Sequence, residues 1–168
     1  MVMVRVDAAI FDLFETLVTE FDPGWRLQPS TASRLGVPET VFNDMWRSRH
    51  IRRMTSVIDF RDVLRDVCSA AGTVIDARID KIIEDLYAER LVTKAKPLIA
   101  VDPRISQALE QLRAGGIKLG LISNCSVEEV ASWPESPLAS VLDSVVFSYR
   151  VGMAKPHREI YLHTCRML

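Results

Sequence analysis

The sequence predicts an α/β fold in which a parallel sheet flanked by helices is interrupted by an all-helical insert. Short apolar runs typical of buried strands alternate with amphipathic helices near the two ends of the chain. The stretch between the first apolar run and the second shows only helical periodicity. With 168 residues, 48% of them hydrophobic, the chain is long enough to bury a core.

The first predicted strand covers residues 4–11, which begin with alternation and end as a continuous apolar stretch. This pattern is typical of a strand that enters a sheet covered on both faces. The strand ends immediately before Asp12. We therefore expect the Asp12 carboxylate at the carboxyl end of the strand.

An all-helical insert is predicted for residues 23–96, between an α/β part formed by 1–22 and 97–168. Three apolar stripes with helical spacing indicate helices that pack on one another. Lys94–Pro97 is predicted to be the return linker, because proline biases the preceding residue away from helix. The stripes are Val41, Phe42, Met45 and Trp46; Phe60, Val63, Leu64, Val67, Cys68 and Ala71; and Ile79, Ile82, Ile83, Leu86 and Tyr87.

The α/β pattern returns after the insert. One helix is well bounded, with Asp102 as N-cap, Pro103 at its first position and Gly115–Gly116 after its end. Strands are predicted at 117–122 and 144–148. This order of elements is typical of a parallel sheet.

Two more helices are expected in this half of the chain. Ser126 and Glu129 have the spacing of a capping box, so a helix should begin there and direct its free N–H groups at the end of the second strand. Pro156 is expected to open a final helix. The apolar face of that helix would consist of Ile160, Tyr161, Cys165 and Leu168.

The composition points to a small partner. Lys and Arg number 21 and Asp and Glu 22, so a net charge of −1 gives no reason to expect nucleic acid or a membrane surface as partner. Neither a membrane-spanning run nor a signal peptide is evident, and we expect a cytoplasmic protein. Three widely spaced cysteines, Cys68, Cys125 and Cys165, suit reduced thiols better than disulfides or a zinc site.

Groups capable of chemistry follow each predicted strand. Asp12 follows the first strand, Ser123 and Asn124 the second, and Lys155 lies a few residues after the third. In an open parallel sheet, ligands collect outside the carboxyl ends of the strands. A carboxylate, a hydroxyl and an ammonium at that edge form a site suited to nucleophilic attack on an anionic substrate.

The residues around these groups resemble the motifs of the haloacid dehalogenase superfamily. Phe11–Leu17 (FDLFETL) is similar to its first motif, Ile122–Asn124 to its second and Gly152–Pro156 to its third, in the right order. A helical insert directly after the first motif resembles the cap domain of the branch that contains haloacid dehalogenases and many small-molecule phosphatases. The resemblance spans the whole chain and implies a Rossmann-like core.

The resemblance implies a hydrolase in which Asp12 attacks the substrate and forms an aspartyl ester that water then hydrolyses. Ser123 and Asn124 would bind the transferring group, and Lys155 would bind it, neutralise its charge and steady the nucleophile. Thr16 would support the loop of the first motif. The expected partner is a small anionic molecule: a phosphate ester, an acyl phosphate or a haloacid.

One departure from the family pattern concerns the general acid. Family phosphatases carry an aspartate two residues after the nucleophile, where this chain has Phe14, which cannot exchange protons. Halide or another good leaving group would suffer less from that loss, and the dehalogenases of the family have an aromatic residue at this place. The adjacent Glu15 is expected to be a surface turn residue rather than a substitute acid.

A second departure concerns the fourth motif, an acidic pair, for which nothing after Lys155 is suitable. If the protein is a phosphatase, Mg²⁺ would be held by Asp12 and the Phe14 backbone carbonyl, with the remaining ligands absent from this chain. A dehalogenase would need no metal. Without the missing units the first strand is expected to be an exposed apolar edge, and two copies could associate through it or through the insert. The alternative is a catalytically impaired member that acts as a binding or scaffold protein.

Other candidates have simpler interpretations. A basic cluster in the insert could contact a substrate carboxylate or phosphate, or nucleic acid, but it is expected to be a solvated helix face: Arg47, Arg49, His50, Arg52 and Arg53. Arg26 and Arg34 are the nearest arginines to the first motif that could hold a substrate carboxylate. Cys125 is not expected to act as a nucleophile, because no histidine is placed to activate it. The histidines have no ligand-like spacing: His50, His157 and His163.

Overall fold

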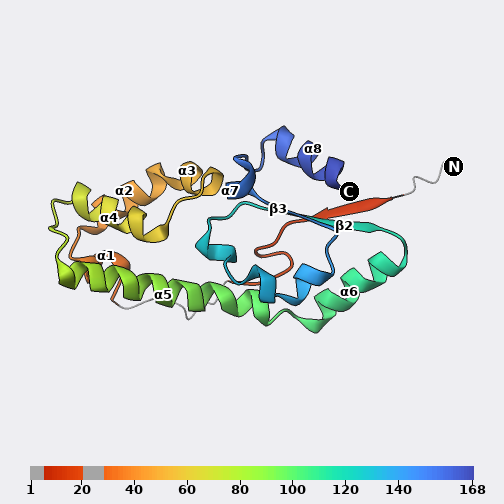
Figure 1. The fold of residues 1–168 in the computed structure, drawn as a ribbon, viewed down its shortest axis with the longest axis horizontal. Helices are drawn as coiled ribbons and strands as arrows, with labels where there is room; N and C mark the ends of the chain where they lie inside the picture. The colour runs from red at the N-terminus through yellow and green to blue at the C-terminus, as the bar shows by residue number, and fades with distance from the viewer. Residues whose placement is uncertain (1–5, 21–28) are drawn as a thin grey trace.

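The computed structural model describes residues 6–20 and 29–168. The sheet has three parallel strands in the order β1 (Ala8–Phe11), β2 (Lys118–Ser123) and β3 (Ser144–Phe147). Figure 1 shows this sheet at one end of the molecule and a lobe of helices at the other, joined by one long helix. The predicted α/β fold with a helical insertion between the first two strands is confirmed.

The register of the sheet brings the predicted site residues to one edge. Phe11 lies opposite Leu121, and Ser123 lies opposite Phe147. Because the three strands run in the same direction, the segments that follow them leave from the same edge. Asp12 and Asn124 therefore follow neighbouring strand ends, as predicted.

The central strand β2 is covered on both faces. Leu119 and Leu121 belong to the larger core cluster on one face, where α6 (Pro103–Ala114) packs. On the other face Ile122 packs with Ile160 of α8 (Arg158–Met167). Figure 1 shows the two helices on opposite sides of the sheet. The alternation follows from the two-residue period of a strand.

The first strand is shorter and more exposed than predicted. Of the predicted residues 4–11, only Ala8–Phe11 form the strand, and residues 4 and 5 lie outside the described residues. Ala8 and Ile10 are exposed because α8 packs on β2 and β3 and leaves β1 uncovered. The expectation of a strand covered on both faces is wrong for this face. Within the described chain β1 does lie at the edge of the sheet, as expected.

From residue 29 onward, the described part of the insert forms five helices: α1 (Thr31–Leu35), α2 (Glu39–Ser48), α3 (His50–Thr55), α4 (Phe60–Ala70) and α5 (Ala77–Ile99). The three predicted stripes lie on α2, α4 and α5 and join one core cluster, in which Leu64 and Ile83 are fully buried. Stacked and edge-on aromatic rings run through it from Phe42 to Trp46, Phe60 and Tyr87. Burial of these faces stabilises helices that are individually short.

The predicted linker Lys94–Pro97 is wrong, because α5 continues without a break to Ile99. Proline removes one backbone hydrogen bond in a helix. Here it lies within the last turn, where Leu98 is fully buried and the Ala100 N–H still donates to Lys96 O at 2.9 Å. The long helix therefore crosses the predicted domain boundary, and the division of the chain into 1–22 with 97–168 and 23–96 stays a prediction.

The helix predicted at Ser126 is also wrong. The chain forms only a 3₁₀ turn, η1 (Glu128–Val130), followed by η2 (Trp133–Glu135), η3 (Pro137–Ser140) and, after β3, α7 (Ser148–Val151). Half of the capping box is present, since Glu129 accepts a hydrogen bond from Ser126 N at 2.9 Å. The Ser126 hydroxyl instead donates to Glu128 at 2.7 Å, which leaves the helix start without its side-chain acceptor.

The final helix begins two residues later than expected, at Arg158, with His157 as its N-cap. Its buried face consists of Ile160 and Thr164, whereas Tyr161 and the predicted Cys165 are exposed. The helix bounded by Asp102 and Gly115 is confirmed. No helix in the described ranges is both long and apolar enough to cross a bilayer.

Candidate active site

Asp12 follows β1 directly, and its contacts with the described residues fix one of its two carboxylate oxygens. Its Oδ1 accepts a hydrogen bond from the Leu13 N–H at 2.8 Å and lies 2.6 Å from the Lys155 Nζ. Neither contact uses Oδ2, and 47% of the Asp12 side chain is exposed. A charge-assisted contact of this length is strong and orients the carboxylate. The arrangement leaves a lone pair of Oδ2 available for attack on a substrate.

Lys155 is held in place by Asn124 through its backbone. The Asn124 amide donates to Lys155 O at 2.9 Å, and the Lys155 N–H donates to Asn124 Oδ1 at 2.8 Å. Both ends of the Asn124 side chain therefore fix the segment that carries the ammonium. The contact makes Asn124 a positioning residue, and its predicted role in binding substrate stays a prediction.

Ser123 ends β2 with a buried hydroxyl. Its side chain is fully buried, and its Oγ has no hydrogen-bond partner within residues 6–20 and 29–168. A buried hydroxyl without a partner is unfavourable in the free protein. The neighbouring Cys125 is tied to Ser148 by two hydrogen bonds, which join the loops after β2 and β3. Ser123 thus keeps a donor available at this edge of the sheet, as its predicted role requires.

The loop after Asp12 is a tight turn in which Leu13 O accepts hydrogen bonds from the N–H groups of Leu17 and Val18. Glu15 adopts a left-handed conformation with φ of 56°, and its carboxylate accepts a hydrogen bond from Glu20 N at 2.8 Å. This contact confirms Glu15 as a turn residue. Thr16 is exposed and donates its backbone N–H to Leu13 O, so it belongs to the turn.

Phe14 occupies the place of the family acid and packs against the main core cluster. Its ring centroid lies 5.6 Å from Lys94 Nζ on α5. The turn residues therefore bring no second acid to Asp12 other than the exposed Glu15, which is already hydrogen-bonded.

The described residues do not fit a resident magnesium site. Mg²⁺ requires near-octahedral oxygen coordination. Within residues 6–20 and 29–168, no cluster of three or more carboxylate, histidine or cysteine side chains is arranged to hold a metal. Asp12 is the only predicted carboxylate ligand, and its Oδ1 is already bound to Lys155.

A buried ion-pair network, which the sequence analysis missed, joins α5 to the turn after Asn124. Arg90 contacts Glu128 at 2.9 Å and Glu129 at 3.1 Å, and Lys94 contacts Glu129 at 3.3 Å and Glu20 at 2.7 Å. Burial by itself would raise the pKa of Glu129, but Lys94, Arg90 and the Ser126 N–H together hold it below its usual value. The i,i+4 spacing of Arg90 and Lys94 was the available signal, yet an exposed helix face has the same spacing.

Several sequence candidates take no part in this site. Burial raises the pKa of the Cys125 thiol to about 12, so Cys125 is not a thiolate nucleophile at neutral pH. Arg34 forms two hydrogen bonds with Glu89, at 2.5 and 2.9 Å. Arg26 lies outside the described residues. His50 and His157 are exposed.

The basic cluster of the insert is not uniformly solvated. Arg47 and Arg52 are exposed, and Arg49 pairs with Asp66 at 3.1 Å. Arg53 is only 4% exposed, so the expectation of a solvated face is wrong for this residue. The reason is that α3 packs against α7, which turns Arg53 inward over the ring of Trp46.

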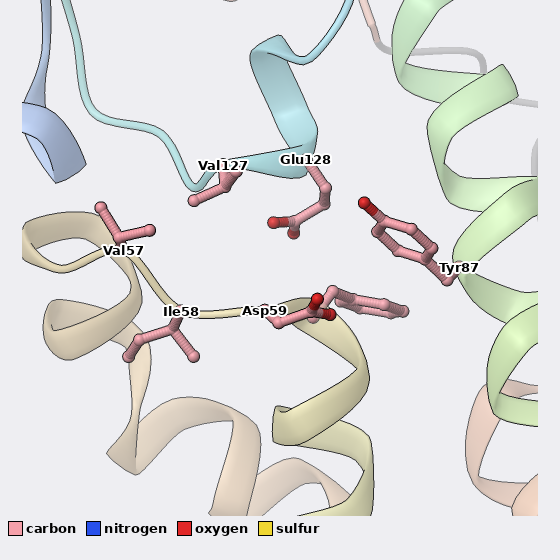
Figure 2. A pocket seen from close by; sticks show the side chains of 7 residues that line it. Val57, Ile58, Asp59, Tyr87, Val127 and Glu128 are labelled. Atoms are coloured by element: carbon pink, nitrogen blue, oxygen red, sulfur yellow. The ribbon is translucent and has the colours of Figure 1, made fainter. Parts of the chain in front are cut away.

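Two adjoining cavities lie beside α3. One, of about 250 Å³, is lined by Arg49, Arg52, Arg53, Val57, Ile58, Asp59, Asp62, Val63 and Asp66. The other, of about 120 Å³, shares Val57, Ile58 and Asp59 with the first. Figure 2 shows these residues of the α3–α4 connection facing Val127 and Glu128 of the turn after β2, with Tyr87 of α5 at the side. The second cavity therefore lies between the insert and the sheet domain.

The fold and these side chains define a class of hydrolase: a parallel sheet, a helical insert after its first strand, and an aspartate paired with a lysine at the sheet edge. The haloacid dehalogenase-like hydrolase family matches residues 6–168, and the chain belongs to that family.

Comparisons with individual proteins agree with this assignment. The chain is 25% identical over 177 aligned residues to an (S)-2-haloacid dehalogenase of Pseudomonas fluorescens, and the match covers 95% of this chain and 69% of that protein. The same enzyme of Pseudomonas putida matches to the same extent. A haloacid dehalogenase family enzyme from Bacteroides thetaiotaomicron, crystallised as a magnesium complex, has the same fold, with a TM-score of 0.61 at 15% identity over 96% of this chain and 77% of that one.

Proposed function

We propose that this protein is a hydrolase in which Asp12 attacks a small anionic substrate and forms a covalent aspartyl ester. The observation that carries the proposal is the geometry of Asp12: Oδ1 is held by the Leu13 N–H and Lys155, and Oδ2 is left for attack. Splitting one difficult displacement into two easier ones is the general advantage of a covalent intermediate.

Displacement of halide from a 2-haloacid is the reaction that we favour. Asp12 Oδ2 would form a bond to the carbon that bears the halogen, and the halide would leave with the electron pair of the broken bond. Water would then add to the acyl carbon of the Asp12 ester. Its oxygen stays in the restored carboxylate, one of its protons goes to the released hydroxy acid, and the other goes to solvent. Halide needs no proton, so Phe14 in place of an acid costs this reaction little.

The surroundings of Asp12 suit this chemistry. Lys155 would compensate the negative charge of the substrate carboxylate as it approaches Asp12, and the unpartnered Ser123 hydroxyl would donate a hydrogen bond to the substrate. Two haloacid dehalogenases are also among the matching relatives.

Phosphate transfer is the second candidate, favoured by the Mg²⁺ complex of the Bacteroides enzyme with the same fold. A phosphate ester with a poor leaving group needs a proton from the protein, and general acid help is typically worth roughly 100- to 10,000-fold. With Phe14 at that place, we expect aryl or acyl phosphates to react far better than alkyl phosphates. A binding or scaffold role is the third candidate, and it is favoured by Phe14 and by the lack of a metal-holding cluster among the described residues.

The test compares wild type with Asp12→Asn on a 2-haloacid and on an aryl phosphate, each with and without Mg²⁺. Asp44→Asn is the matched control, because Asp44 is an exposed aspartate of α2. We expect Asp12→Asn to lose at least about 1,000-fold in rate, since it removes the nucleophile, and Asp44→Asn to keep the rate. Equal rates for wild type and Asp12→Asn would refute the nucleophile, and no turnover of either substrate by wild type would favour the binding role.

The proposed partner is a small anionic molecule, and two copies of the chain could associate. A small anionic molecule fits the local positive charge at a protein of net charge −1. Association of two copies through the insert or the exposed β1 edge stays a prediction, which light scattering of the purified protein tests directly.

A further inference from the structure

We propose that Arg53 binds a carboxylate or phosphate group of the substrate, remote from the group that Asp12 attacks, so that the preferred substrate carries two anionic groups. This inference rests on the proposed function, which places the reacting end of the substrate at Asp12. Its binding test, given below, does not depend on turnover.

Arg53 has hydrogen-bond donors and no acceptor for them. The residue is 4% exposed, and its Nε and Nη1 are buried without a partner anywhere in the described chain. A buried guanidinium with unpaired N–H groups is unfavourable, so such a group is retained where something else supplies the acceptor. Burial, and then the charge of nearby Arg90, lower the pKa of Arg53, whereas Glu129 and Glu128 partly restore it.

Trp46 holds the guanidinium in a fixed plane. The Arg53 Cζ lies 3.6 Å from the centroid of the Trp46 ring, which is a close stacking contact. A stacked guanidinium keeps its donor edge directed sideways, in the geometry that binds a carboxylate or phosphate through two parallel hydrogen bonds. Arg53 is therefore preorganised for an anion with oxygen ligands.

The carboxylates around Arg53 are already paired with other arginines. Asp59, Asp62 and Asp66 line the 250 Å³ cavity together with Arg53. Each of the three lies within 3.2 Å of a different arginine: Asp59 pairs with Arg61, Asp62 with Arg65, and Asp66 with Arg49. None of these three ion pairs involves Arg53, although Arg53 lines the same cavity.

Arg53 also lies on the side of the insert that faces the candidate active site. Two residues further along α3, Thr55 O lies 3.8 Å from the position of a Cβ on Gly152, three residues before Lys155. The smaller cavity continues from the α3–α4 connection to Val127, three residues after Asn124 (Figure 2). The loops that hold Asn124 and Lys155 thus adjoin the helix that carries Arg53.

Arg61 provides a matched control within the same insert. Its Cζ lies 4.5 Å from the Tyr87 ring centroid, so it too is a stacked arginine. Its Nε, Nη1 and Nη2 all donate to carboxylates of Asp59 or Glu84. Stacking on an aromatic ring is common to both residues, and unpaired donors distinguish Arg53.

The first experiment follows Trp46 fluorescence during titration with glutarate and, separately, with inorganic phosphate. We expect a saturable change with at least one anion, and the better ligand identifies the chemistry that Arg53 prefers. Arg53→Met should weaken binding at least about tenfold, the loss expected for hydrogen bonds to a charged group. Arg61→Met should bind as wild type does. Trp46→Phe keeps an aromatic ring beneath the guanidinium and should abolish the signal.

The outcomes separate a ligand site from a structural role. Thermal unfolding of Arg53→Met should occur no lower than that of wild type, because methionine keeps the apolar stem and removes the unpaired donors. Equal affinities of Arg53→Met and wild type, or no saturable change in wild type, would overturn the proposal. Loss of binding in Lys155→Met as well would assign the anion to the Asp12–Lys155 site and also overturn it.

The second experiment compares turnover of a chlorinated dicarboxylic acid with that of the chlorinated monocarboxylic acid of the same length. We expect Arg53→Met to raise KM for the dicarboxylate at least about tenfold and to leave kcat and the monocarboxylate unchanged. Turnover of both acids with the same KM in Arg53→Met and wild type would refute the role of Arg53 and leave the proposed dehalogenation standing. Absence of turnover with either acid would count against the proposed dehalogenation, and the fluorescence titration would still decide the role of Arg53.

Discussion

Replacing Glu129 by glutamine should loosen the attachment of α5 to the turn after Asn124. The substitution keeps the shape of the side chain and an acceptor for the Ser126 N–H, and it removes the charge that faces Arg90 at 3.1 Å and Lys94 at 3.3 Å. Breaking a buried ion pair by removing one partner costs about 3–5 kcal/mol. Because Arg90 keeps Glu128 and Lys94 keeps Glu20, we expect the low end of that range, about 3 kcal/mol.

Urea unfolding at neutral pH measures the loss, and Glu84→Gln is its control. Glu84 also faces two arginines, Arg61 at 3.2 Å and Arg65 at 3.7 Å, but its side chain is 47% exposed. Exposed pairs contribute little. We expect no measurable loss for Glu84→Gln. Equal effects of the two substitutions would refute the reasoning that burial decides the contribution of the network.

The pH dependence of the same pair of proteins gives a second readout. The pKa of Glu129 in the folded protein lies below its ordinary value of 4.5. The carboxylate therefore contributes its full stability above that ordinary value and loses it as the pH falls through the lower, folded value. The difference in stability between wild type and Glu129→Gln should be constant near neutrality and shrink below that ordinary value. A difference that grew on acidification would contradict the assigned sign.

Three further substitutions or reactions test separate parts of the account. Leu64→Ala should destabilise the protein by about 2–5 kcal/mol in urea unfolding, because Leu64 is fully buried in the insert core. A loss of stability below about 1 kcal/mol would mean that the cavity collapses or that the core is not packed there. A thiol reagent at mildly alkaline pH should modify Cys165 quickly and leave Cys125 unmodified in the native protein. The reason is that Cys165 is exposed, whereas the pKa of the Cys125 thiol is raised to about 12. Fast labelling of Cys125 would contradict its burial. Asn124→Ala should lower kcat about tenfold or more, because it removes both hydrogen bonds that fix the Lys155 backbone. The control Asp44→Asn should keep the kcat of wild type. An unchanged kcat in Asn124→Ala would show that Lys155 does not need these contacts.

Local chemistry that the backbone must satisfy was predictable from the sequence. Asp102, Pro103 and the glycines at 115 and 116 bound a helix at both ends, and the structure begins and ends α6 there. The apolar stripes of α2, α4 and α5 have the helical period that their shared core requires. The placement of Asp12 and Lys155 at one edge of the sheet followed from the strand order, and the family resemblance implied that Lys155 steadies Asp12.

Features decided by tertiary contacts were not predictable. Pro97 was expected to end a helix, yet burial of Leu98 carries α5 through it. A capping box at Ser126 and Glu129 was expected to start a helix, but the Ser126 hydroxyl donates to Glu128, which is paired with Arg90 from another element. Local propensity is a weak prior when such contacts are available.

Arg53 shows the limit of a charge pattern. A run of basic residues on a helix has the same sequence whether all of them face solvent or one of them turns inward. Arg53 is turned inward over the ring of Trp46, and α3 packs against α7, a contact that joins segments distant in the chain. Arg90, Lys94, Glu128 and Glu129 were missed for the same reason.

The nucleophilic role of Asp12 is tested most directly by isotope labelling. After many turnovers of a 2-haloacid in water labelled with a heavy oxygen isotope, peptide mapping should find the label in the Asp12 carboxylate. The reason is that hydrolysis of an aspartyl ester at its acyl carbon transfers an oxygen of water to the enzyme. Turnover that leaves Asp12 without label, with the isotope found only in the product, would contradict the covalent aspartyl intermediate.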